Sequence, residues 1–254
     1  MPPETVSQPP EDWFAESFGV LYPLVYAHRS DEAAEREARF VLELLAPDTS
    51  LPLLDCGCGT GRHLLWLARH LPRAIGLDFS LPLLRTAREK LGAIVPLVRG
   101  DMRRLPFPDR SFGYACSFFT SFGYFEDIEN ARVLSEWARV LRPGGLLFLD
   151  YLNTDHVRRN LRPESHRVMG PWSIQEYRWI DPRARRVNKR VRLTDPGGNT
   201  REFHESVRLY EPAELESLLA DHGLRVYRRF GGYDGRSRSS EADRLLLLAR
   251  REIV

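Results

Sequence analysis

The fold of this chain is decided by residues 53–61, LLDCGCGTG, an apolar run that enters three alternating glycines and continues into a helical pattern. Glycine has no Cβ and lets a ligand approach the main chain, and the first turn of the following helix offers free N–H groups. The dinucleotide fingerprint GxGxxG needs a glycine where Arg62 stands, and the phosphate-binding loop needs GxxxxGK followed by Ser or Thr, so neither motif fits. We predict a strand, a tight turn and a helix N-terminus that together hold a ligand.

Three further segments follow the glycines along the chain. Residues 75–80, IGLDFS, read as a second strand ending at Asp78, about 20 residues after the glycines, where a carboxylate can accept hydrogen bonds from ribose hydroxyls. Residues 98–102 read VRGDM, and residues 140–147 read VLRPGGLL. Together with the glycine loop, these segments resemble, in the same order, four motifs of the class I S-adenosylmethionine-dependent methyltransferases.

The resemblance implies S-adenosylmethionine as the cofactor and gives roles to particular residues. The glycine loop would lie against its amino acid and ribose, Asp78 would accept from the ribose hydroxyls, and Phe79 would cover the adenine, whose amino edge Asp101 and Met102 would fix. These roles agree with the chemistry of the side chains, although acids at strand ends also commonly cap helices. The predicted cofactor-binding residues are Asp55, Gly57, Cys58, Gly59, Asp78, Phe79, Asp101, Met102 and Ser117.

The acceptor side of the site has weaker signals. Residues 117–125, SFFTSFGYF, lack the Asn or Asp followed by Pro-Pro of base-amine methyltransferases, and no proline precedes Cys116 as in RNA cytosine C5 methyltransferases. The segment resembles the loop of small-molecule methyltransferases, including sugar-amine N-methyltransferases. Residues 22–26, YPLVY, resemble the tyrosine-bearing lid of the same group, and a purely structural packing of these tyrosines is the alternative. The predicted substrate and lid residues are Tyr22, Tyr26, Phe118 and Tyr124.

Tyr26 and His28 are the candidate catalytic residues. A histidine with a pKa near 6.5 can deprotonate a substrate, although a lone histidine more often has a structural role, and His63 and His156 are weaker candidates. Methyl transfer requires in-line placement of the acceptor, which by itself can supply roughly 7 to 11 kcal/mol of the barrier, so a base is optional for an amine. The acids and histidines have no metal-ligand spacing, and we predict no metal site.

Composition narrows the possible partners and the compartment. The net charge is +2, with 37 basic and 35 acidic residues, which gives no reason to expect a nucleic-acid or membrane partner. No apolar run reaches the roughly 20 residues of a membrane span, so we expect a soluble, cytoplasmic protein. Three cysteines form no disulfide framework or zinc motif. Residues 153–210 are rich in arginine, for which a solvated sheet face, a contact with an anionic substrate and an RNA-facing patch are the three interpretations.

The alternation of strand and helix patterns predicts an α/β fold, a doubly wound, seven-stranded Rossmann-like methyltransferase sheet with an antiparallel β insertion. We predict a disordered lead-in over residues 1–12, a helical lid over 13–46, a cofactor-binding core over 47–152, the β-rich insertion over 153–210 and the rest of the core sheet over 211–254. The expected function is methyl transfer to a nitrogen or oxygen atom of a small molecule. An RNA methyltransferase and a non-catalytic cofactor-binding protein are the alternatives, and the insertion could form a homodimer contact.

Overall fold

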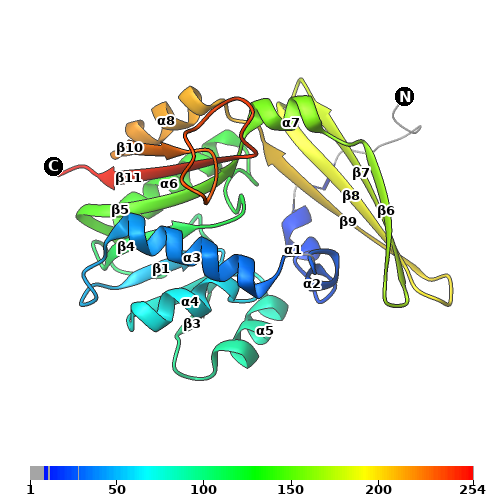
Figure 1. Ribbon diagram of the computed structural model, residues 1–254, viewed down its shortest axis with the longest axis horizontal. Coiled ribbons are helices and arrows are strands. Elements are labelled where there is room, and N and C mark those ends of the chain that lie inside the picture. The colour runs from blue at the N-terminus through cyan, green and yellow to red at the C-terminus, as the bar shows by residue number, and fades with distance from the viewer. Residues whose placement is uncertain (1–8, 11, 28, 254) are drawn as a thin grey trace.

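The computed structural model describes residues 9, 10, 12–27 and 29–253, which form two β-sheets and the helices around them (Figure 1). The helices are α1 (Trp13–Ser17), α2 (Tyr22–Val25), α3 (Asp31–Leu45), α4 (Arg62–His70), α5 (Leu81–Leu91), α6 (Asp127–Val140), α7 (Thr154–Asn160) and α8 (Pro212–Asp221). The strands are β1 (Leu53–Cys56), β2 (Ala74–Asp78), β3 (Leu97–Arg99), β4 (Phe112–Ser117), β5 (Leu141–Leu152), β6 (Glu164–Met169), β7 (Trp172–Asp181), β8 (Arg186–Thr194), β9 (Thr200–Arg208), β10 (Leu224–Phe230) and β11 (Arg244–Arg251). Most of the predicted lead-in lies outside the described residues.

The larger sheet has seven strands in the order β10-β11-β5-β4-β1-β2-β3. The strands from β3 to β5 pair in parallel, whereas β11 runs antiparallel to both β5 and β10. The strand order reverses between β1 and β4, so the carboxyl ends of these strands meet at the kind of switch point where open α/β sheets bind ligands. The predicted fold class is confirmed.

Two layers of helices bury the two faces of this sheet. Trp137 of α6 is fully buried in one core together with residues of α8, and Leu64 and Leu67 of α4 are fully buried in another with residues of α3 and α5. Ser30 and Ser80 cap the starts of α3 and α5, because each hydroxyl accepts a hydrogen bond from a main-chain N–H three residues later, at 3.2 Å. The helices therefore fix the loops that connect them to the carboxyl ends of the strands.

The smaller sheet is the β insertion, in which β6, β7, β8 and β9 are antiparallel neighbours between β5 and α8. The alternating patterns at residues 173–180, 187–193 and 201–209 indicate β7, β8 and β9, whereas β6 has little apolar signal, because its residues ESHRVM alternate between exposed and half-buried positions. α1 and α2 lie between the two sheets (Figure 1). Val25 of α2 is buried against Ile174, Val191 and Leu193 of the smaller sheet. The N-terminal segment thus joins the insertion to the core.

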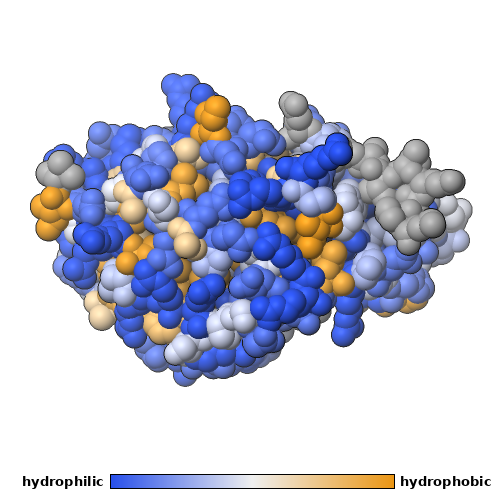
Figure 2. All heavy atoms as spheres, turned by 90° about the horizontal axis from the view of Figure 1, so that it is seen from above, coloured by the Kyte–Doolittle hydropathy of each residue, from blue (hydrophilic) through white to orange (hydrophobic). Residues whose placement is uncertain are grey.

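The surface is mostly polar on the face shown in Figure 2, where hydrophilic side chains surround small separate groups of hydrophobic ones. Within the described part of the chain, every helix is too short or too polar to cross a lipid bilayer.

Candidate active site

A cavity of about 380 Å³ opens at the carboxyl ends of β1, β2 and β4, and residues of α1 and α2 form its opposite wall. Its volume falls in the range of roughly 300–1,000 Å³ that small-molecule sites occupy. The predicted site residues that line it are Tyr22, Tyr26, Gly57, Cys58, Gly59, Asp78, Phe79, Asp101, Met102, Phe118 and Tyr124. The structure therefore brings most of the predicted site together, while His28 lies outside the described residues.

The glycine loop has the backbone conformation that its sequence predicts. Gly57, Gly59 and Gly61 all have positive φ, at 80°, 55° and 74°. A Cβ on Gly57 would lie 2.8 Å from the Cβ of Ser121, whereas a Cβ on Gly59 would have no atom within 4 Å. Since Gly59 also lines the cavity, the open space above it is a cradle that only a glycine leaves free.

Asp78 connects the end of β2 to this loop. Its Oδ2 accepts a hydrogen bond from Gly59 N at 2.8 Å, and its Oδ1 accepts one from Ser80 N at 2.8 Å. Burial raises the pKa of Asp78, against the lowering effect of these main-chain donors. A carboxylate has about four acceptor positions, so both oxygens keep the capacity to accept from a ligand in the cavity.

Asp55 and Ser117 lie behind the cavity instead of on its wall. Both are fully buried, because β1 and β4 are the central strands and are covered on both faces. Asp55 Oδ1 and Ser117 Oγ have no hydrogen-bond partner in the part of the chain that the structure describes. Burial and, to a lesser degree, the nearby Asp78 carboxylate raise the pKa of Asp55 to about 8. Sequence position alone could not separate these residues from those that face the ligand.

The adenine side that the resemblance predicts is built from aromatic rings and one ion pair. Phe79 is 39% exposed, and its ring meets the ring of Phe14 edge to face at 5.8 Å. Asp101 pairs with Arg103, whose Nη2 donates to Oδ2 at 2.7 Å. Partial burial by itself would raise the pKa of Asp101, but the hydrogen bonds from Arg103 outweigh it and lower the pKa. The carboxylate is thus held charged beside Met102.

The two lid tyrosines contact each other and the insertion. The rings of Tyr22 and Tyr26 lie 4.6 Å apart, and the Tyr26 hydroxyl donates to Glu205 of β9 and accepts from Lys189 Nζ of β8 at 2.7 Å. Burial is the main cause that raises the pKa of Tyr22 and of Tyr26, and the carboxylate of Glu205 raises both further. Both side chains line the cavity, so a packing role alone does not account for their placement.

The loop between β4 and α6, residues 118–126, supplies the remaining wall. Phe119 and Thr120 have positive φ, at 51° and 60°, which is strained for residues with a Cβ. The buried Asp150 holds this turn, because its Oδ2 accepts from Phe119 N at 2.7 Å and its carbonyl accepts from Thr120 N at 2.9 Å. Arg244 Nε in turn donates to Asp150 Oδ1 at 2.6 Å. The network keeps the Phe118 and Phe119 side chains at the cavity.

His63, which the sequence gives little reason to select, also lines the cavity. Its imidazole stacks on the ring of Phe118, with centroids 4.0 Å apart and planes 2° from parallel, and its Nε2 lies 2.7 Å from Glu37 Oε2. Burial lowers the pKa of His63, although the hydrogen bond with Glu37 opposes that effect. The imidazole is therefore a neutral, fixed part of the wall.

Arg29 and Arg62 are cationic cavity residues that sequence reasoning did not select. Both guanidinium groups lie over the Phe119 ring, with Cζ 4.6 and 5.4 Å from its centroid. Among the residues that the structure describes, no carboxylate forms an ion pair with either one. Burial and then the charge of Arg29 lower the pKa of Arg62. Two half-buried cations without an ion-pair partner among the described residues, both over the same ring of the cavity wall, match an anionic group on the ligand.

S-adenosylmethionine fits this arrangement at both ends. The space over Gly59 admits a ligand close to the main chain, Asp78 provides acceptors for hydroxyls, and the arginines can neutralise a carboxylate. The described residues contain no group of three or more acids, histidines or cysteines placed to hold a metal ion. The fold and the site together define a methyltransferase.

Comparison with known proteins agrees with this class. Residues 53–145 match the family model of a methyltransferase domain. The chain is 31% identical over 233 residues, 85% of its length and 93% of the other, to a dTDP-3-amino-3,4,6-trideoxy-alpha-D-glucopyranose N,N-dimethyltransferase of Streptomyces venezuelae. The chain belongs to the class I S-adenosylmethionine-dependent methyltransferases.

Two solved structures are similar over nearly their whole lengths. The CcbJ methyltransferase of Streptomyces caelestis superposes with a TM-score of 0.79 at 23% identity, over 93% of this chain and 98% of the other. CalS10 of Micromonospora echinaspora, an amino pentose methyltransferase solved with S-adenosylmethionine bound, superposes with a TM-score of 0.65 at 25% identity, over 91% and 96%. The resemblance to the class I methyltransferases, the predicted cofactor and the predicted enzyme class are confirmed, and methyl transfer to a small molecule is confirmed as the reaction.

Proposed function

We propose that this enzyme methylates a nitrogen atom of a small amine held against the tyrosine side of the cavity. The observation that carries the proposal is that Tyr22, Tyr26 and Tyr124 all line the cavity. Their hydroxyls are neutral phenols at neutral pH, and burial moves their pKa values still further from that range. A neutral phenol can hydrogen-bond to an amine but is a poor base for an alcohol. The names of the Streptomyces venezuelae and Micromonospora echinaspora relatives, which act on amino sugars, support an amine acceptor.

We assign the methionine end of S-adenosylmethionine to the arginine side of the cavity. Arg29 would bind the cofactor's carboxylate, because its guanidinium lies on the cavity wall without a carboxylate partner among the described residues and is held by Tyr22 Oη at 3.4 Å. Gly59 would leave room for the cofactor chain, and Asp78 would accept from its ribose hydroxyls. The aromatic rings of Phe14 and Phe79 would lie near the adenine.

When bound, S-adenosylmethionine supplies a methyl carbon on a sulfonium sulfur, and the lone pair of the amine forms the new N–C bond as the C–S bond breaks. The residues of the chain then have to orient the amine in line with that bond and exclude water. Tyr26 is suited to orientation, because Glu205 and Lys189 fix its hydroxyl from two sides. We propose it as a hydrogen-bonding residue and not as the base, since burial raises its pKa.

The arginines of the insertion give little support to RNA as the acceptor. Most of them pair with acids of the chain, as Arg167 and Arg178 do with Glu176 and Arg192 does with Glu202. Such pairs neutralise the positive charge that would bind RNA phosphates.

We also propose a cytoplasmic location, which the three unpaired, buried cysteines favour. A homodimer contact through the insertion remains part of the proposal and is tested by sedimentation.

Labelled methyl transfer from S-adenosylmethionine to matched acceptor panels tests this function. One panel holds nucleotide-linked amino sugars, amino acids and short peptides, and the second holds the corresponding compounds with a hydroxyl in place of the amine. We expect transfer only to amines, with rates that change little between about 50 and 200 mM salt. Transfer to the hydroxyl panel would overturn the choice of nitrogen. Transfer to RNA that falls steeply with salt would overturn the small-molecule acceptor.

A further inference from the structure

Arg186, the first residue of β8, is a buried arginine whose guanidinium donates hydrogen bonds to the β4–α6 loop of the active site. Its Nη1 donates to Phe125 O at 3.0 Å, and its Nη2 donates to Tyr124 O at 2.6 Å and to Gly123 O at 3.3 Å. Arg186 also donates to Ser206, from Nε to Oγ at 2.8 Å and from Nη2 to the carbonyl oxygen at 3.0 Å. Three consecutive carbonyls of the β4–α6 loop therefore converge on a single guanidinium.

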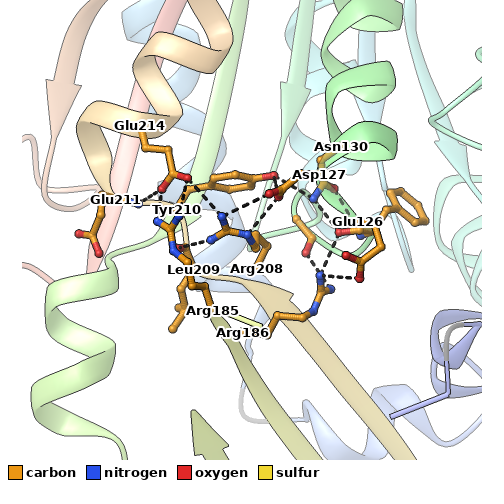
Figure 3. A network of polar contacts seen from close by, with 12 residues as sticks. Glu126, Asp127, Asn130, Arg185, Arg186, Arg208, Leu209, Tyr210, Glu211 and Glu214 are labelled. Carbon is orange, nitrogen blue, oxygen red and sulfur yellow. Dashed lines mark hydrogen bonds and ion pairs between the residues drawn. The ribbon is translucent and has the colours of Figure 1, made fainter. Parts of the chain in front are cut away.

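These contacts span the two sheets of the molecule. Arg186 and Ser206 belong to the smaller sheet, whereas the loop of residues 118–126 belongs to the core and carries Tyr124 and Phe125 on the cavity wall. In Figure 3 the side chain of Arg186 points from its strand toward Glu126 at the start of α6. Arg186 Nη1 lies 3.6 Å from Glu126 Oε1. The arginine lies outside the cavity and acts on it through the loop.

The chemistry of the site explains why an arginine stands there. Removing a guanidinium from water is costly unless every donor is satisfied, and the planar fork of arginine can serve several carbonyls at fixed angles. Gly123, with φ of 96°, turns the loop so that its carbonyl also accepts from Arg208 N at 2.8 Å. Ser206 is held as well, because its Oγ donates to Asn188 Oδ1 at 2.7 Å. The guanidinium of Arg186 is thus held in place by its own sheet, through Ser206 and Asn188.

We propose that Arg186 is a positioning residue for methyl transfer. By holding the carbonyls of residues 123–125, it fixes the Tyr124 and Phe125 rings, so the smaller sheet sets the acceptor side of the cavity without touching the acceptor. The role in turnover rests on the proposed function. The effect on the loop does not, and it can be measured without an acceptor.

Hydrogen exchange on the cofactor-bound protein tests the effect on the loop. Arg186→Met should speed exchange of the amides of residues 121–126 at least tenfold, while β1, β4, β6 and β7 change less than threefold. Arg186→Lys should give an intermediate value, because one ammonium replaces part of the fork. Arg192→Met is the matched control, since Arg192 also lies on β8 but, among the described residues, forms its ion pair with Glu202 and contacts no carbonyl of the β4–α6 loop. Unchanged exchange in the loop, or an equal rise across the smaller sheet, would overturn the proposal.

Kinetics with the amine that the acceptor panel identifies test the effect on turnover. We expect kcat to fall at least tenfold in Arg186→Met and to recover partly in Arg186→Lys, with the Kd for S-adenosylmethionine within threefold of the original. A normal kcat in a variant whose loop exchanges faster would overturn the positioning role. If Arg186→Met does not fold, Ser206→Ala removes the acceptor of Nε and should produce the same local pattern at smaller size. A panel without any methylated amine would contradict the proposed function, and the exchange result would still decide the loop contact.

Discussion

Gly59 N donates a 2.8 Å hydrogen bond to Asp78 Oδ2, which ties the glycine loop after β1 to the carboxyl end of β2. The two residues are 19 positions apart in the chain: Asp78 ends β2, and Gly59 lies in the loop that follows β1, the parallel neighbour of β2. The contact places the acid beside the space over Gly59, and it makes the loop and the ribose-binding residue that we propose one structural unit.

Replacing Asp78 by alanine should weaken binding of S-adenosylmethionine at least tenfold. The variant loses a charged hydrogen-bond acceptor, and such bonds contribute about 1.5–3 kcal/mol each. Calorimetric titration measures the affinity, and Asp78→Asn, which keeps one acceptor oxygen, should lie between. Asp48→Ala is the control, because Asp48 also accepts from a main-chain N–H, that of Ser50, but is absent from the cavity wall. Unchanged affinity in a folded Asp78→Ala protein would exclude the role given to Asp78.

Alanine substitutions at Gly57 and Gly59 should have different effects. At Gly57 the new Cβ would meet Ser121 at 2.8 Å, so Gly57→Ala should lower thermal stability by several degrees. At Gly59 no protein atom lies within 4 Å, so backbone strain gives a smaller loss of stability, and the methyl group occupies the space proposed for the cofactor. We expect Gly59→Ala to weaken binding of S-adenosylmethionine at least tenfold, although it lowers the melting temperature less than Gly57→Ala does. If the two variants lose the same affinity for each degree of melting temperature lost, the cofactor does not occupy the space over Gly59.

Arg29 should determine whether the enzyme distinguishes S-adenosylmethionine from its decarboxylated analogue. With a guanidinium available for the carboxylate, the original enzyme should bind the complete cofactor at least tenfold more tightly. Arg29→Met should bind both compounds with similar affinity. Arg39→Met serves as the control, because Arg39 pairs with Glu35 on the surface of α3. A preference for the carboxylate that survives in Arg29→Met would assign its binding to another residue, with Arg62 the first to test.

The sequence predicts the core of the fold and most of the residues that line the cavity beside the glycine loop, because both depend on local signals. A glycine loop, a strand-end acid and alternating strand and helix patterns each determine structure within a few residues of their own position. The sequence does not select Arg29 or Phe119 and offers His63 only as a weaker candidate, since each becomes a cavity residue only through contacts far away in the chain. His63, for example, is distinguished from other helical histidines by Glu37 and Phe118.

Residues with the same sequence signal can also differ in depth. Asp55 and Asp78 both stand at or near the end of a parallel strand, but only Asp78 reaches the cavity. Asp55 is within its strand and is covered from both faces, which no motif records. The acceptor side shows the same limit, because the contact of Arg186 with residues 123–125 joins two sheets that are separate in sequence.

Asp55 should make stability depend on pH in a particular direction. Burial raises its pKa in the folded protein from 3.8 to about 8, so between these values the folded state holds a proton that the unfolded state has lost. The free energy of unfolding therefore falls as pH rises through this window, by about 1.4 kcal/mol for each pH unit. Asp55→Asn, which has nearly the same shape and does not titrate, should remove this contribution.

The measurement is the free energy of unfolding in urea at pH 5.5 and pH 8 for both proteins. Relative to Asp55→Asn, the original protein should lose about 3 kcal/mol between the two pH values. Other titrating groups, such as His63, act equally in both proteins and cancel in the difference. Asp221→Asn, at the exposed end of α8, should behave like the original protein. An equal pH dependence in Asp55→Asn and the original protein would mean that Asp55 is ionised in the folded state, so a partner for its buried Oδ1 would have to be found.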